Sequence, residues 1–143
     1  MNPRRAVVAG LLATVAMTLL FFLEPLLGLP RMAEGGILST VMSATVAYLP
    51  VGFVGGWLIH FGVGVILALL FALVAAARLP GSMTVRGIIF GIIVFVLAQL
   101  VVMPLVGAGL FSGGNLARLT GSLAGHVVYG AVLGWFIGRG QAT

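Results

Sequence analysis

The stretch GWLIHFGVGVILALLFA, residues 56–72, returns in altered form as SLAGHVVYGAVLGWFIG, residues 122–138. Each copy holds one histidine, His60 or His126, inside a series of small residues spaced by four. Residues four apart share one face of an α-helix, so each copy predicts an apolar helix whose small-residue face is broken by a single imidazole. These two are the only histidines in the chain.

The composition places the whole chain in a membrane. Hydrophobic residues make up 62% and charged residues 6% of the 143 residues, whereas an ordinary soluble domain carries about 25% charged residues. The mean hydropathy is +1.30. A chain of this length has no room for an additional soluble catalytic domain, and we expect no nucleic-acid partner and no large soluble partner. The absence of cysteine excludes disulfides, thiolate metal sites and thiol redox chemistry.

Four apolar runs reach the roughly 20 residues that a membrane-spanning helix needs. They predict an all-α, polytopic, antiparallel four-helix bundle forming one domain, with spans at about 6–28, 50–77, 85–107 and 117–138. A weaker apolar run predicts a short interfacial helix at 37–48.

Arginine positions predict the orientation. An even number of spans puts Arg4, Arg5, Arg78, Arg86 and Arg139 on one side and Arg31 and Arg118 on the other. The positive-inside rule then places both termini in the cytoplasm of a bacterial cell, with the chain in the inner membrane.

The two halves of the chain resemble each other. An offset of 66 residues aligns Gly55, His60 and Gly64 with Gly121, His126 and Gly130. Both histidine-bearing spans run in the same direction, so the pattern predicts a duplicated helix pair with parallel rather than inverted repeats.

The two histidines allow three interpretations. First, alternate helices of a four-helix bundle face each other diagonally, so His60 and His126 could ligate a b-type haem. Second, His60 and His126 with Glu24 and Met103 form a ligand set suited to copper or non-haem iron, because helical rise places all four in the outer half of the bundle. Third, neutral histidines between small residues could simply hydrogen-bond neighbouring helices.

Glycines at helical spacing predict close helix packing. The candidate packing positions are Gly56, Gly64, Gly87, Gly91, Gly121, Gly125, Gly130 and Gly134. We expect Gly87, Gly91, Gly121 and Gly125 to face outward, where they would dock against other membrane-protein subunits or a second copy of the chain.

The histidine-x-x-x-glycine element at His60–Gly64 and His126–Gly130 resembles that of small uncharacterised four-span bacterial inner-membrane proteins. Some members of that group are encoded near respiratory oxidases, which implies an accessory role in electron transfer. The sequence has no glycine-rich phosphate loop and no serine–histidine–acid spacing. We therefore expect a small accessory or structural subunit of a larger membrane complex without catalytic activity of its own. The alternatives are a haem- or metal-binding redox protein and an oligomeric transporter or channel component.

Overall fold

The computed structural model describes residues 2–23, 26, 28, 52–105 and 107–140. Within these residues the chain is helical throughout and contains no strand, as the composition predicts. The predicted interfacial helix at 37–48 and the predicted start of the second span at Pro50 lie outside the described residues.

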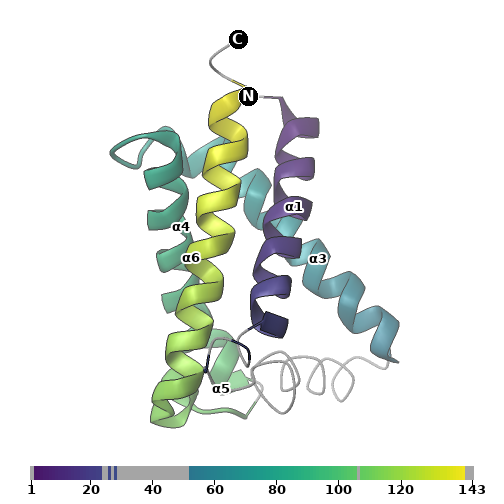
Figure 1. The fold of residues 1–143 in the computed structure, drawn as a ribbon, viewed down its shortest axis with the longest axis vertical. Helices are drawn as coiled ribbons and strands as arrows, with labels where there is room; N and C mark the ends of the chain where they lie inside the picture. The colour runs from purple at the N-terminus through teal and green to yellow at the C-terminus, as the bar shows by residue number, and fades with distance from the viewer. Residues whose placement is uncertain (1, 24–25, 27, 29–51, 106, 141–143) are drawn as a thin grey trace.

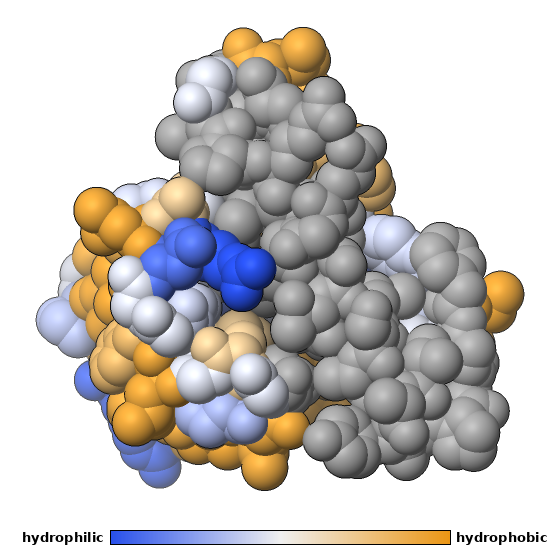
Figure 2. Space-filling model, turned by 90° about the horizontal axis from the view of Figure 1, so that it is seen from below, coloured by the Kyte–Doolittle hydropathy of each residue, from blue (hydrophilic) through white to orange (hydrophobic). Residues whose placement is uncertain are grey.

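Four helices are long and apolar enough to cross a membrane. They are α1 Pro3–Leu23, α3 Gly52–Leu70 with its π-helical continuation η2 Phe71–Ala75, α4 Met83–Leu97 with η3 Ala98–Val102 and α5 Met103–Leu105, and α6 Leu116–Arg139. The protein is therefore a multi-pass membrane protein, and its many exposed aliphatic side chains contact the lipid bilayer. Seen along the bundle in Figure 2, such apolar side chains lie around the rim.

Polar residues define where these helices begin. Pro3 occupies the first turn of α1, where its missing N–H costs nothing, and the Asn2 carboxamide oxygen accepts a hydrogen bond from the Arg4 N–H at 3.0 Å. Ser82 caps α4, and the Asn115 side chain caps α6 by accepting from the Arg118 N–H at 3.0 Å. Helices α1, α4 and α6 therefore begin next to these capping residues.

The helices do not form a closed square. Helix α6 packs against α4 on one side and α1 on the other, and α1 in turn packs against α3 (Figure 1). Helix α3 meets α4 closely only through η2, next to the turn that joins them, and it slants away from the bundle beyond that point. Among the described residues, the fourth side of the bundle, between α3 and α4, is the one that the packing leaves open.

Glycines bring α4 and α6 into backbone contact. A Cβ at Gly87 would overlap the carbonyl oxygen of Gly130, and a Cβ at Gly91 would overlap that of His126. The expectation that Gly87 and Gly91 face outward is therefore wrong, because α6 covers both. Gly125 likewise faces inward, against Phe21 of α1, and Gly121 and Gly56 are buried.

Two positions that the sequence offset relates each contact a glycine of another helix. Gly64, on α3, lies against Gly10 of α1, and Gly130, on α6, lies against Gly87 of α4. Gly64 and Gly130 are related by the offset of 66 residues, whereas Gly10 and Gly87 are not. The duplicated helix pair therefore stays a prediction.

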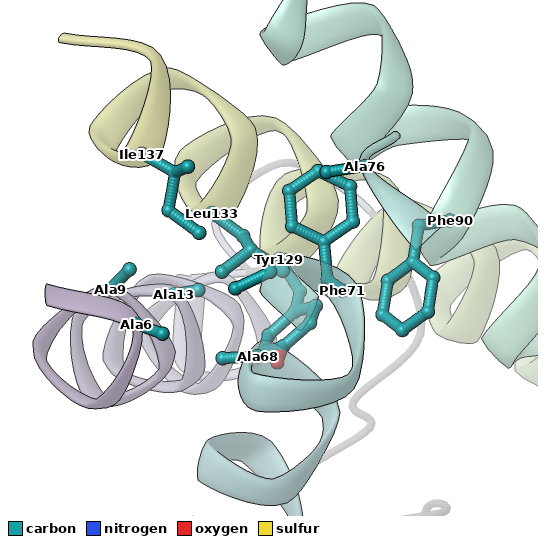
Figure 3. Packing of buried hydrophobic residues seen from close by; sticks show 11 residues of the cluster. Ala6, Ala9, Ala13, Ala68, Phe71, Ala76, Phe90, Tyr129, Leu133 and Ile137 are labelled. Carbon is teal, nitrogen blue, oxygen red and sulfur yellow. The ribbon is translucent and has the colours of Figure 1, made fainter. Parts of the chain in front are cut away.

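The hydrophobic core, part of which Figure 3 shows, lies toward the end of the bundle at which α1 begins and α6 ends, the end that carries Arg5 and Arg139. It joins three alanines of α1 to residues of α3, η2, α4 and α6, and includes Ala6, Ala9, Ala13, Ala68, Phe71, Ala76, Phe90, Tyr129, Leu133 and Ile137. The other end of the bundle, where α3 has left α4, holds the two histidines.

Candidate functional site

His60 and His126 line one cavity of about 480 Å³, here called the histidine cavity. Every membrane-spanning segment contributes to its wall. The lining residues are Thr14, Met17, Phe21, His60, Val63, Gly64, Leu67, Val94, Leu97, Ala98, Val101, Val102, Met103, Ser122, His126 and Tyr129. Apart from the two imidazoles and a few hydroxyl groups, the wall is aliphatic or aromatic.

As far as the described residues go, the cavity opens onto the lipid-facing surface between α3 and α4. Val63 of α3 is 48% exposed, and Leu97 and Val101 on the opposite side are 54% and 51% exposed, yet all three line the cavity. Because these side chains belong both to the cavity wall and to the outer surface, they form its rim. A molecule dissolved in the bilayer would reach the histidines by passing between α3 and α4.

A hydroxyl group of α1 fixes the ring of His60. The Thr18 Oγ1 lies 2.7 Å from the Thr14 carbonyl oxygen and 3.1 Å from the His60 Nε2. A carbonyl oxygen only accepts, so the single Thr18 hydroxyl proton goes to Thr14, and Thr18 accepts from an Nε2–H of His60. In the neutral ring, the lone pair of His60 is therefore on Nδ1. Trp57 and Phe61 hold the same ring edge-on, with centroids 5.8 and 5.6 Å away.

The ring of His126 is fixed by its own helix. Its Nδ1 lies 2.7 Å from the Ser122 carbonyl oxygen, one turn earlier, so Nδ1 carries the hydrogen. The lone pair is then on Nε2, at the end of the ring remote from the backbone. Phe95 of α4 packs edge-on against this ring at a centroid distance of 5.8 Å. The two histidines are thus held in opposite tautomers, each with one ring nitrogen that has no hydrogen-bond partner among the described residues.

A chain of buried side chains supports the His126 side of the cavity. Ser112 Oγ donates to Gln99 Oε1 at 2.8 Å, and Gln99 Nε2 donates to Ser122 Oγ at 3.2 Å. Gln99 is fully buried in the π-helical segment η3, and π-helical turns inside α-helices are frequent at functional sites. Through these two bonds the loop that precedes α6 is tied to α6 beside His126.

The loop that supplies Ser112 is conformationally strained. It contains η4, Leu110–Gly114, in which Phe111 and Ser112 have φ angles of 48° and 54°. L-residues pay roughly 1–2 kcal/mol each for this left-handed conformation. The buried Ser112–Gln99 hydrogen bond, at about 0.5–1.5 kcal/mol, offsets part of this cost.

Tyr129 closes the cavity toward the core. Its hydroxyl group donates to the Gly64 carbonyl oxygen at 2.6 Å, which joins α6 to α3 across the bundle. Thr14 uses its hydroxyl on the Gly10 carbonyl oxygen at 2.8 Å. Neither hydroxyl hydrogen is therefore left for a molecule in the cavity.

The structure brings together three of the four residues predicted as metal ligands. Met103 is buried and lines the cavity with both histidines, whereas Glu24 lies outside the described residues. Within the described part of the chain, no group of three or more histidine, cysteine or carboxylate side chains is close enough to hold a metal ion.

Two features weigh against a haem between the rings. The Nε2 of His60 is engaged with Thr18, which leaves only Nδ1, next to the ring's own Cβ, for ligation. No arginine is among the described residues that line the cavity, so nothing there would neutralise the haem propionates.

The sequence did not single out Thr14, Thr18, Tyr129 or Ser112. Gly10, Thr14 and Thr18 are spaced by four, and this stripe could have marked the face of α1 that meets α3. Gln99 bonds Ser112 and Ser122, and no hydrogen bond joins it to either histidine among the described residues. For Ser112 we find no sequence signal, because its burial depends on the left-handed turn.

Comparison with known proteins assigns the chain to a family but does not identify its activity. A family model described as a family of unknown function, DUF6789, matches residues 1–143. No curated protein and no solved structure matches the chain.

Proposed function

The chain belongs to the DUF6789 family of unknown function, and from the geometry of its histidine cavity we propose that it binds an apolar small molecule taken from the bilayer. The observation that carries this proposal is the lateral cavity of about 480 Å³ that ends at two imidazoles. Ligand pockets in proteins commonly measure roughly 300–1,000 Å³ and combine an apolar wall with a few polar groups that orient the ligand.

The rim of the cavity supports entry from the membrane. Val63, Leu97 and Val101 are aliphatic and exposed at membrane depth, so acyl chains or a lipid-soluble molecule can pass them without desolvating any polar group. Inside, the two neutral rings offer the main polar contacts. An apolar ligand with a polar end would therefore lie with its body against aliphatic side chains and its polar end at the histidines.

We further propose that the arginine-bearing end faces the cytoplasm of a bacterial cell and that the chain lies in the inner membrane. Arg5 of α1 donates to the Phe136 carbonyl oxygen near the end of α6 at 2.7 Å, and Arg86 donates to the Ala76 carbonyl oxygen at 2.7 Å. These contacts gather the arginines that start α1 and α4 at one end of the bundle. Under the positive-inside rule that end is cytoplasmic, and the histidine cavity opens in the outer half.

A bound metal ion is the second candidate. The Nδ1–H of His126 donates to a backbone carbonyl oxygen, which is the usual outer contact of a metal-binding imidazole and leaves Nε2 free to ligate. Met103 would add a soft sulfur ligand from the same cavity wall, which suits copper. Metal analysis of the purified protein separates this candidate from the first.

The accessory-subunit role and the transporter alternative stay predictions. Docking on other subunits was expected to use outward glycines at positions such as Gly87 and Gly91. Both glycines pack inside the protein, against α6. A partner, if one exists, would have to recognise another surface.

Filling the cavity tests the proposed function. Ala98→Phe adds a ring where Ala98 lines the cavity, whereas Val96→Phe adds one on the exposed surface of the same helix. Native mass spectrometry of protein released from membrane nanodiscs should show a bound small molecule on the wild type and on Val96→Phe, and none on Ala98→Phe. An equal ligand signal on all three proteins would contradict the proposal.

A further inference from the structure

We infer that the histidine cavity selects lipid-soluble hydroquinones over the corresponding quinones, because it offers hydrogen-bond acceptors and almost no donors. This inference rests on the proposed function, since it names the chemical class of molecule that the cavity would take. It follows from the hydrogen bonds in which the polar hydrogens at the cavity are already engaged.

The acceptors are the two ring nitrogens. Since His60 uses Nε2–H on Thr18, its Nδ1 keeps a lone pair, and since His126 uses Nδ1–H on Ser122, its Nε2 does the same. Both side chains line the cavity. A molecule that leaves these lone pairs unmatched would bury two polar atoms without partners, which is costly in an apolar setting.

The donors at the cavity are almost all committed. The Tyr129 hydroxyl group donates to Gly64, and the Thr14 hydroxyl group donates to Gly10. Ser122 Oγ accepts from Gln99, and its own hydroxyl hydrogen is the single uncommitted donor of the described lining residues. The cavity therefore distinguishes ligands by the hydrogen-bond donors that they carry and not by their acceptor oxygens.

A hydroquinone supplies what the cavity lacks. It has two hydroxyl donors on a flat apolar ring, and an attached alkyl chain would lie along the aliphatic rim at Val63 and Val101. The oxidised quinone carries only acceptor oxygens, so it would face both imidazole lone pairs without a hydrogen to share. A bare metal ion would fill only a small part of about 480 Å³.

The experiment compares three probes that share one substituted ring and one alkyl chain. They are decylubiquinol, decylubiquinone and the dimethyl ether of decylubiquinol, each added to the full chain in nanodiscs. Binding is measured by retention on the protein relative to empty nanodiscs. Two hydrogen bonds to buried acceptors predict that the quinol binds at least about tenfold more tightly than the quinone or the ether. The ether controls for the donors, since it keeps the ring, the alkyl chain and the two former hydroxyl oxygens, adds two methyl groups and has no hydroxyl hydrogen.

Two variants identify the acceptors. His60→Phe and His126→Phe keep a ring and remove the lone pair, so each should reduce quinol binding roughly three- to tenfold. Retention of the ether should be the same on both variants as on the wild type, which shows that the cavity persists. If a variant loses the ether as well, the three-probe comparison on the wild type decides by itself.

Failure of this inference is distinguishable from failure of the proposed function. Equal binding of all three probes to the wild type, blocked by Ala98→Phe, overturns the hydroquinone preference and leaves a general apolar site. A quinol preference that persists in both histidine variants also overturns the inference. If none of the three probes binds, the inference is overturned, and the native mass spectra of wild type, Val96→Phe and Ala98→Phe decide the proposed function. Probe binding that Ala98→Phe leaves unaffected overturns both.

Discussion

The two histidines occupy related sequence positions but are held in different ways. Thr18, on a neighbouring helix, receives the hydrogen of His60, whereas a carbonyl oxygen of its own helix receives that of His126. The repeat in the sequence predicted two imidazoles in the same part of the bundle. It could not predict their tautomers, because these depend on a hydroxyl group of α1 and on the backbone at Ser122.

Removing the hydroxyl group that orients His60 should weaken the protein. In Thr18→Val, the Nε2–H of His60 loses its acceptor in an apolar setting, and we expect a loss of roughly 1–3 kcal/mol in the free energy of unfolding. Unfolding by sodium dodecyl sulfate in mixed micelles measures this change. Thr120→Val is the matched control, since the Thr120 hydroxyl is exposed and bonds only its own helix. An equal effect of the two substitutions would show that Thr18 has no special role.

At the scale of the helices, glycine spacing predicted close packing but not the partner. A stripe such as Gly87 and Gly91 shows that one face of a helix is smooth, yet a lipid-facing contact and an internal one give the same pattern. The structure places this face against α6. Likewise, the length of the third span was predictable, whereas the π-helical segment η3 that buries Gln99 was not, because no residue pattern in this apolar run marks it.

A methyl group at the α4–α6 contact should be poorly tolerated. In Gly87→Ala, the new Cβ would overlap the Gly130 carbonyl oxygen, so the helices must separate, at a cost of about 1–3 kcal/mol or more. Gly62→Ala is the control, because nothing lies within 4 Å of its Cβ position. That change should instead stabilise α3 by about 0.5–1 kcal/mol. Thermal unfolding in detergent measures both. Equal stability of the two variants would contradict the packing described here.

In the whole molecule, the tightly packed core and the histidine cavity lie toward opposite ends of the bundle. The core of alanines and aromatic side chains joins all four helices near the arginines, and the departure of α3 from α4 leaves the histidine cavity at the other end. Hydropathy predicted the four spans and the turn between α3 and α4, whereas the connection between the first two spans lies largely outside the described residues. The slant of α3 was not predictable, since it results from how the small faces of α1, α3 and α6 fit together.

The proposed orientation predicts which ends a water-soluble reagent can reach. The chain contains no cysteine, so a single introduced cysteine is the only thiol in the protein that a maleimide can label. In Pro80→Cys the thiol lies in the exposed turn at the arginine-bearing end, and in Leu116→Cys it lies at the 72%-exposed start of α6. A membrane-impermeant maleimide added to intact spheroplasts should label Leu116→Cys and spare Pro80→Cys until the membrane is opened. The reverse pattern would invert the proposed topology.

The central claim, that two neutral imidazoles of opposite tautomer each offer a lone pair to the cavity, is tested most directly by a ¹⁵N nuclear magnetic resonance spectrum of the histidine-labelled protein. Assignment through His60→Phe and His126→Phe should give a hydrogen on Nε2 for His60 and on Nδ1 for His126, with the other nitrogen of each ring unprotonated. A doubly protonated ring, or the same tautomer at both positions, would contradict the account.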